Sequence, residues 1–210
     1  MEALLEKAKE CGFDACGIVP VDVLFRERER LERWIGQGFH AGMNYMANNI
    51  EKRENPALLV EGARSVIVTL TNYYTPKLQS EGIPVVARYA YGKDYHRVVK
   101  DRLFKLHTCL EEVTGRKITG RAFVDSAPVF EHEWDRRAGL GWIGRNYLLI
   151  HPRLGSYCFI GVIISDFEPS RYSLPEERNF CGQCNRCVEA CPTGALSSHE
   201  VNANLCISYN

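Results

Sequence analysis

The segment that most restricts this chain is Cys181-Gly-Gln-Cys184-Asn-Arg-Cys187-Val-Glu-Ala-Cys191-Pro192. Its cysteines have the C-x2-C-x2-C-x3-C-P spacing of bacterial ferredoxins. Three thiolates spaced by two residues can ligate one iron–sulfur cubane from a single loop, and the fourth, before a proline, serves a neighbouring cluster. Zinc and a redox-active pair formed by Cys181 and Cys184 are the competing interpretations, although zinc-binding pairs are normally farther apart. The spacing favours an iron–sulfur site.

A fifth candidate ligand, Cys206, lies fifteen residues after Cys191 in the segment LCISY. Two 4Fe–4S clusters need eight thiolate ligands, and the candidates here are five. We therefore expect the chain to be truncated, with the remaining ligands beyond Asn210, and to bind the clusters incompletely. The other cysteines fall on apolar patterns, as packing thiols do: Cys11, Cys16, Cys109 and Cys158.

Length and composition describe an ordinary globular protein. The chain has 210 residues, 45% hydrophobic and 25% charged, with 26 basic and 26 acidic side chains. This length suits a core of about 150–170 residues with a small added module. Zero net charge neither requires nor excludes a nucleic-acid partner. The sequence has neither a run of ~20 apolar residues nor a signal peptide, so we expect a cytoplasmic protein without membrane contact.

Periodicity predicts an α/β (α+β) fold with a mixed sheet. Helices are expected over 2–11, 23–35, 94–113 and 127–138; strands over 13–19, 65–73, 85–92 and 117–124; and a hairpin from 147–150 and 157–165. The polar, proline-containing residues 168–179 separate a domain at 1–167 from a cluster module at 180–210.

Asp125 is the principal candidate for chemistry. It is expected at the end of a strand, before Ser126-Ala127-Pro128 and a helix. The structural alternative is a helix N-cap, a role that Ser126 could fill instead. The acids that follow in this helix, among them Glu131 and Asp135, are expected to be mostly solvated.

A glycine motif, G-x-G-x-x-G, occupies residues 139–144. A dinucleotide-binding loop must follow a strand and open a helix, whereas this motif follows a predicted helix and precedes a strand. We expect the glycines around Trp142 to let the backbone pass close to a flat, bulky ligand. Arg136, Arg137 and Arg145 could contact phosphates or pair with neighbouring acids.

Seven segments together resemble the epoxyqueuosine reductases, over almost the whole chain. They are GMNYM, KRENP, NYY, RYAYGKDYH, VDSAPVFEHEWDRRAGLGWIGRNYLLI, CGQCNRCVEACPTGAL and CISY. The resemblance implies a nitroreductase-like domain that binds cobalamin, followed by a ferredoxin-like domain with two 4Fe–4S clusters and a helical-repeat region. This chain departs from that pattern by ending just after CISY.

The resemblance also implies roles for individual residues. Asp125 matches the proton donor, and Arg53, Ala90 and Ser208 match cobalamin neighbours. Cys181, Cys184 and Cys187 would hold the cluster nearer the cobalamin, and Cys191 and Cys206 would belong to the other cluster.

The implied reaction is the reduction of epoxyqueuosine to queuosine in tRNA, the last step of queuosine biosynthesis. An external electron donor would be required, and a monomer is expected. Two alternatives remain open. One is an electron-transfer module, which leaves Asp125 without a role, and the other is a cobalamin-binding protein without turnover, which leaves the clusters without one.

Overall fold

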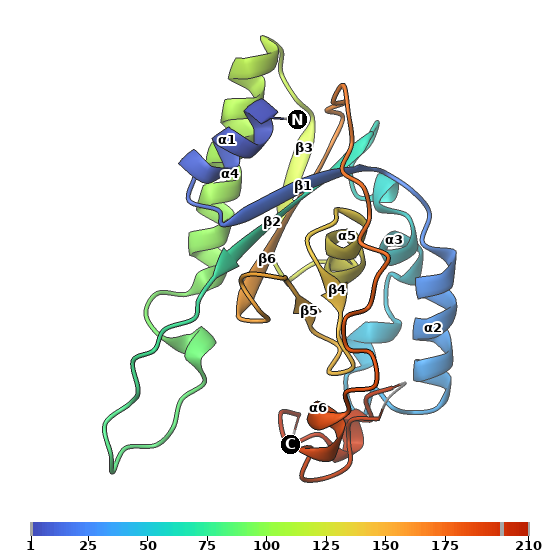
Figure 1. Ribbon diagram of the computed structural model, residues 1–210. Helices are drawn as coiled ribbons and strands as arrows, with labels where there is room; N and C mark the ends of the chain where they lie inside the picture. The colour runs from blue at the N-terminus through green and yellow to red at the C-terminus, as the bar shows by residue number, and fades with distance from the viewer. Residues whose placement is uncertain (1, 198–199, 210) are drawn as a thin grey trace.

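The computed structural model describes residues 2–197 and 200–209, which form an α/β domain and a small C-terminal module (Figure 1). In these residues the main sheet has four strands in the order β1-β2-β6-β3. Their bounds are β1 Ala15–Pro20, β2 Ser65–Asn72, β6 Cys158–Ser165 and β3 Gly120–Phe123. A small second sheet pairs β4 (Trp142–Ile143) with β5 (Leu149–Ile150). The expected α/β fold class is confirmed.

The expectation of a mixed sheet is wrong, because each pairing between the described strands is antiparallel. The helix α4 (Tyr95–Thr114) lies between β2 and β3 in the sequence. These two strands run in the same direction, but β6 lies between them and pairs with both. The crossover through α4 therefore produces no parallel pair.

The sheet is covered by helices on both faces, so its central strands are buried on both sides. On one face α1 (Glu2–Glu10) and α4 pack against Ile18, Ile67 and Ile163. On the other, α5 (Glu131–Arg137) packs Trp134 against the opposite side chains of β2 and β6. Figure 1 shows α2 (Phe25–Gly36) and α3 (Ile50–Glu54) outside α5.

Two expected β-segments differ from the structure. The hairpin expected from 147–150 and 157–165 does not form, because β6 is paired on both edges by β2 and β3, and β5 pairs with β4 instead. The strand expected at 85–92 is a loop with a short 3-10 helix, Arg88–Ala90. Val85 is 91% exposed there, as expected for a residue outside a sheet.

The C-terminal module contains α6 (Arg186–Glu189) and a 3-10 turn at Ala203–Leu205. Further 3-10 turns, Asn44–Ala47 and Pro56–Leu58, flank α3. Four hydrogen bonds tie the segment 201–209 to residues 34–42. They are Trp34 Nε1 to Val201 O (2.7 Å), Ala203 N to Phe39 O (2.8 Å), Asn204 Nδ2 to Gly38 O (2.8 Å) and Gly42 N to Tyr209 Oη (2.8 Å).

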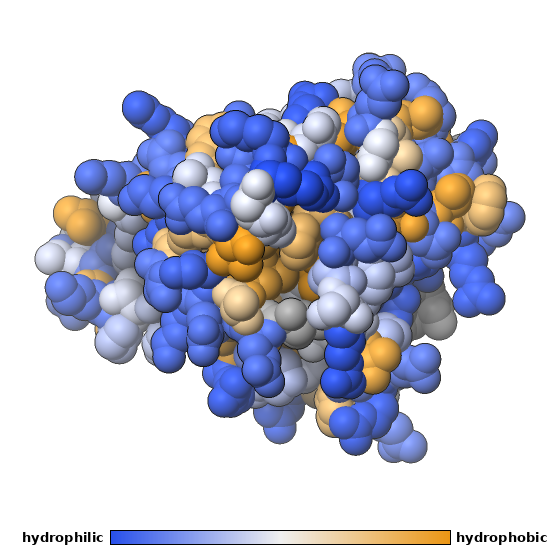
Figure 2. All heavy atoms as spheres, turned by 90° about the horizontal axis from the view of Figure 1, so that it is seen from above, coloured by the Kyte–Doolittle hydropathy of each residue, from blue (hydrophilic) through white to orange (hydrophobic). Residues whose placement is uncertain are grey.

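The surface is mainly hydrophilic. Figure 2 shows one face on which polar and charged residues surround a small apolar area. Among the described residues, no helix has both the length and the apolar character needed to cross a membrane.

Gly161 lies where α4 crosses the central strand β6, and its replacement is expected to destabilise the fold. A Cβ atom there would lie 2.8 Å from Thr69 Oγ1 and 2.9 Å from Val99 Cγ1. Gly161→Ala should lower the free energy of unfolding by about 1–3 kcal/mol, the usual cost of overpacking. Urea denaturation measures it. The control is Gly36→Ala at the end of α2, where a Cβ would meet nothing within 4 Å. Equal stability of both variants would contradict the prediction.

Candidate functional site

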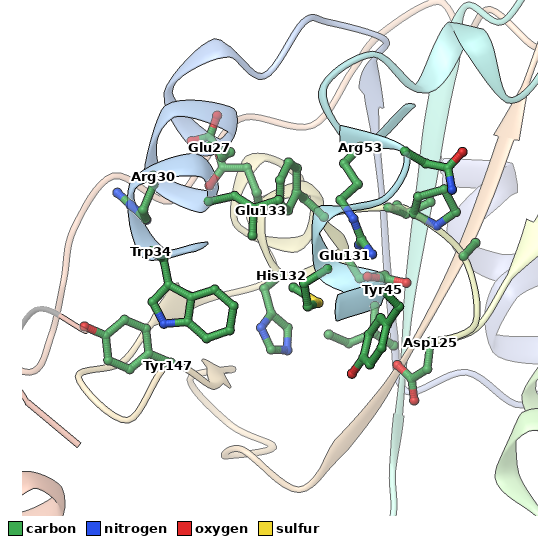
Figure 3. A pocket seen from close by; sticks show the side chains of 18 of the residues that line it. Glu27, Arg30, Trp34, Tyr45, Arg53, Asp125, Glu131, His132, Glu133 and Tyr147 are labelled. Carbon is green, nitrogen blue, oxygen red and sulfur yellow. The ribbon is translucent and has the colours of Figure 1, made fainter. Parts of the chain in front are cut away.

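A cavity of about 930 Å³ lies between α2, α3, the loop after β3 and the start of α5 (Figure 3). Its walls carry aromatic rings, two arginines and several carboxyl groups. The lining includes Glu27, Arg30, Trp34, Tyr45, Arg53, Asp125, Phe130, Glu131, His132, Glu133, Tyr147 and Glu200. Of the predicted site residues, Arg53 and Asp125 meet in this cavity.

Asp125 follows β3 in a backbone conformation that few residues adopt, with φ of 52°. Its carboxylate oxygen Oδ2 accepts a hydrogen bond from Tyr95 Oη and lies 3.9 Å from His96 Nε2. The side chain is 51% exposed. The expected helix from residue 127 begins only at Glu131, and neither Asp125 nor Ser126 caps it. The N-cap interpretations of both residues are therefore wrong.

Tyr95 is the residue that positions Asp125. Its ring is parallel to the ring of Phe159, with centroids 4.0 Å apart, and also stacks on His96. Burial and the neighbouring Asp125 carboxylate raise the pKa of Tyr95, so the phenol remains protonated and donates. Asp94 caps α4 through His96 N, and its oxygen also contacts His96 Nδ1 at 2.8 Å.

Arg53 supplies a cationic group to the cavity wall. Burial lowers the pKa of its guanidinium, and its Nε atom is buried without a hydrogen-bond partner in the described part of the chain. An unpaired buried donor is costly unless a ligand satisfies it. Together with the rings of Trp34, Tyr45 and Phe130, it fits a large ligand with apolar faces and polar edges.

Sequence reasoning missed the acids of α5, which are not mostly solvated: Asp135 is buried, and Glu131 and Glu133 are half-buried. Burial, and secondarily the charge of Asp125, raise the pKa of Glu131 to about 7. Asp135 is fully buried, which raises the pKa of its carboxyl well above the usual range. His132 is exposed, as expected, but it lines the cavity, and partial desolvation there lowers the pKa of its imidazole. The local sequence offered no signal for this, because the packing of Trp134 against the sheet is seen only in the structure.

The two remaining expected cobalamin neighbours lie apart from this cavity. Ala90 is in the exposed loop that precedes α4, and Ser208 is exposed in the C-terminal module. The structure does not bring either residue into the wall formed by Arg53 and Asp125.

Two glycines of the motif are needed for the packing of the chain itself, and the expected contact with a flat ligand stays a prediction. A Cβ on Gly141 would collide with the carbonyl of Ile150, and one on Gly139 with the carbonyl of Leu174. Trp142 packs against Phe180, with ring centroids 4.9 Å apart. The motif precedes β4 and opens no helix, which agrees with the rejection of a dinucleotide site.

The cysteines of the ferredoxin-like segment occupy a turn and a short helix. Cys184 N donates to Cys181 O at 2.8 Å, and Cys187 lies in α6. Backbone N–H groups around Cys191, those of Leu196 and Thr193 among them, lower the pKa of its thiol. Within residues 2–197 and 200–209, no three potential ligands gather as a metal-binding group. The donor set nevertheless has the chemistry of iron–sulfur ligation.

Asp135→Asn is expected to remove a pH dependence of stability. The Asp135 pKa is raised from 3.8, so the folded chain holds a proton that the unfolded chain releases above that pH. The contribution of this proton to the free energy of unfolding is fully present below pH 3.8. It is lost as the pH rises towards the pKa of Asp135 in the folded chain, by at most about 1.4 kcal/mol per pH unit. Thermal unfolding between pH 4 and 8 should therefore show the Asp135→Asn variant gaining stability relative to the wild type as the pH rises. Asp101→Asn on exposed α4 is the control, and parallel curves for both variants would contradict the prediction.

Two family descriptions match the sequence. "Epoxyqueuosine reductase QueG, DUF1730" matches residues 53–126, and "4Fe-4S double cluster binding domain" matches residues 180–210. The first includes Arg53, Ala90 and Asp125, and the second includes the cysteines of the ferredoxin-like segment.

Curated relatives are similar along nearly the whole chain. An epoxyqueuosine reductase of Leadbetterella byssophila is 46% identical over 202 residues, which are 96% of this chain and 66% of the relative. One from Synechocystis sp. is 41% identical over 200 residues, 92% of this chain and 67% of the relative. The chain thus spans about two thirds of the length of these relatives.

A solved structure has the same fold. It is an epoxyqueuosine reductase with an epoxyqueuosine-modified tRNA-Tyr stem loop, at a TM-score of 0.87 and 30% identity. The match covers 99% of this chain and 56% of that one.

Proposed function

This chain belongs to the epoxyqueuosine reductase family, and on that premise we propose that it reduces the epoxide of epoxyqueuosine in tRNA, with cobalamin and 4Fe–4S clusters as cofactors. The observation that carries the proposal is the pair of Tyr95 and Asp125, a held carboxyl group at a cavity that also presents Arg53.

The reaction converts an epoxide, two electrons and two protons into an alkene and water. Asp125 is the group that delivers a proton to the departing oxygen, and the Tyr95 hydroxyl fixes the direction of its carboxyl group. Bound cobalamin would supply a low-potential cobalt centre for the electron transfer to the epoxide-bearing ring. The cavity walls would orient that ring.

The chain's own residues would hold the cofactors as follows. Arg53 would donate to polar edges of cobalamin, while Ala90 and Ser208 would approach it from the loop before α4 and from the module. Cys181, Cys184 and Cys187 would ligate the nearer cluster, and Cys191 and Cys206 the other, each with ligands from outside this set. Residues 1–167 would form the catalytic domain, 168–179 the linker and 180–210 the cluster module.

A tRNA substrate implies a cytoplasmic location, where cysteines such as Cys184 persist as thiols or ligands. The clusters would receive electrons from an external donor, and we propose that the protein acts as a monomer.

The test is conversion of an epoxyqueuosine-containing tRNA stem loop by anaerobically reconstituted protein with a chemical reductant. Mass analysis of the nucleoside should show loss of one oxygen atom, and omission of cobalamin should abolish it. If the clusters are reduced and reoxidised by acceptors while the nucleoside is unchanged, the electron-transfer alternative is correct.

A further inference from the structure

Three carboxyl groups follow one another from the cavity into the core. Asp125 and Glu131 line the cavity, and Asp135 lies one helical turn after Glu131 on α5. Each is close enough to affect the next, because the charge of Asp125 raises the pKa of Glu131, and the charge of Glu131 raises that of Asp135. Such a row can store and pass protons.

The inner two carboxyl groups of this row have few of the partners that would keep them ionised: Asp135 has none among the described residues, and Glu131 has only its own backbone N–H and the charge of Arg53. Glu131 Oε1 and both Asp135 carboxyl oxygens are buried and have no hydrogen-bond partner in the part of the chain that the structure describes. A buried carboxylate without a partner is costly, whereas a protonated carboxyl is not charged. The unpaired oxygens therefore favour a proton on Asp135, and burial of Oε1 favours one on Glu131 against the opposing effects of its own N–H and Arg53.

The groups that face Glu131 come from several elements. Arg53 on α3 is its cationic neighbour, but the two form no ion pair among the described contacts, and Figure 3 places Tyr45 beside them. Asp125 faces it from the loop after β3. His132 follows it on α5, and burial lowers the pKa of that imidazole, so it adds no fixed positive charge at neutral pH.

The proposed reaction consumes two protons for each epoxide, and Asp125 can supply one of them. We propose that Glu131 holds the second proton and passes it to Asp125 through the cavity, so that Asp125 donates again. The inference rests on the proposed function. No oxidant or reductant is needed beyond the electrons of the proposed reaction, since only a proton moves from one carboxyl to the other.

The first test follows the protons without turnover. Carbon NMR of glutamate carboxyl groups, recorded on the cofactor-free chain, should show one midpoint near pH 7. Glu131→Gln should remove it, and Asp125→Asn should shift it to lower pH by removing a neighbouring charge. The control, Glu51→Gln, makes the same change on the exposed side of α3 and should leave it in place. The absence of any glutamate titrating above pH 6 would overturn the proposal.

The second test separates a proton store from a structural role. Glu131→Gln should slow conversion roughly 10- to 100-fold below pH 7, because solvent must then return a proton to Asp125. This effect is at or below the usual contribution of a positioned proton donor. Above pH 8 the wild type has lost this proton, so the two rates should converge. A purely structural defect lowers the rate by one factor at every pH, and that result would overturn the relay while the proposed function stands. A wild type that converts nothing would overturn both.

Discussion

Asp125→Asn is expected to slow single-turnover conversion of the epoxide by roughly 10²–10⁴-fold, the usual contribution of a positioned general acid. The amide has the shape of the carboxyl and can still accept from the Tyr95 hydroxyl, but it has no acidic proton to give. Asparagine also tolerates the left-handed backbone of this position, at a φ of 52°. Rapid-quench analysis of the nucleoside measures the effect.

The interpretation depends on an intact site. Cobalamin binding, followed spectroscopically, should be unchanged in Asp125→Asn, and Asp101→Asn on the exposed side of α4 should convert the substrate at the normal rate. Asp125→Ala is a poorer choice, because alanine in a left-handed conformation adds about 1–2 kcal/mol of backbone strain. A normal rate in Asp125→Asn would remove this residue from the chemistry.

Cys184→Ser is expected to abolish conversion, with a loss of at least about 10²-fold, since a cluster that lacks a thiolate ligand cannot relay electrons. Iron and acid-labile sulfide per chain should fall together with the visible absorbance of the cluster. Cys184 is the most accessible cysteine of its segment, so its loss should leave the fold of the other domain unaltered.

The matched control is Cys16→Ser in the main domain. Burial raises the pKa of that thiol to about 12, which marks it as a packing residue and not a ligand. Iron content should be normal in this variant. Equal iron content in Cys184→Ser and the wild type would contradict the cluster assignment.

Sequence periodicity predicted the elements whose patterns are local. The strand β2 and the long helix α4 formed as expected, because an apolar run and helix spacing are properties of neighbouring residues. The pairing of β5 with β4 was not predictable in this way. It depends on β6 having both edges occupied, a fact about strands far apart in the sequence.

The residues of the candidate site also differ in whether the sequence could predict them. The match to family motifs predicted Asp125 and Arg53, and the structure places both at one cavity. The roles of Tyr95 and Glu131 needed three dimensions: the first reaches Asp125 across 30 residues, and the second is buried by a packing arrangement that helical spacing alone does not reveal.

Trp34 belongs to the cavity wall and also donates its indole N–H to Val201 of the module, 2.7 Å away. Electron tunnelling weakens steeply with separation, so this connection would set the electronic coupling between the proposed clusters and the cavity. With three further hydrogen bonds joining the same two segments, Cys206 and the cavity wall form one mechanical unit. If the module carries the proposed clusters, these contacts hold it against the cavity wall, and electron delivery is expected to depend little on solvent viscosity.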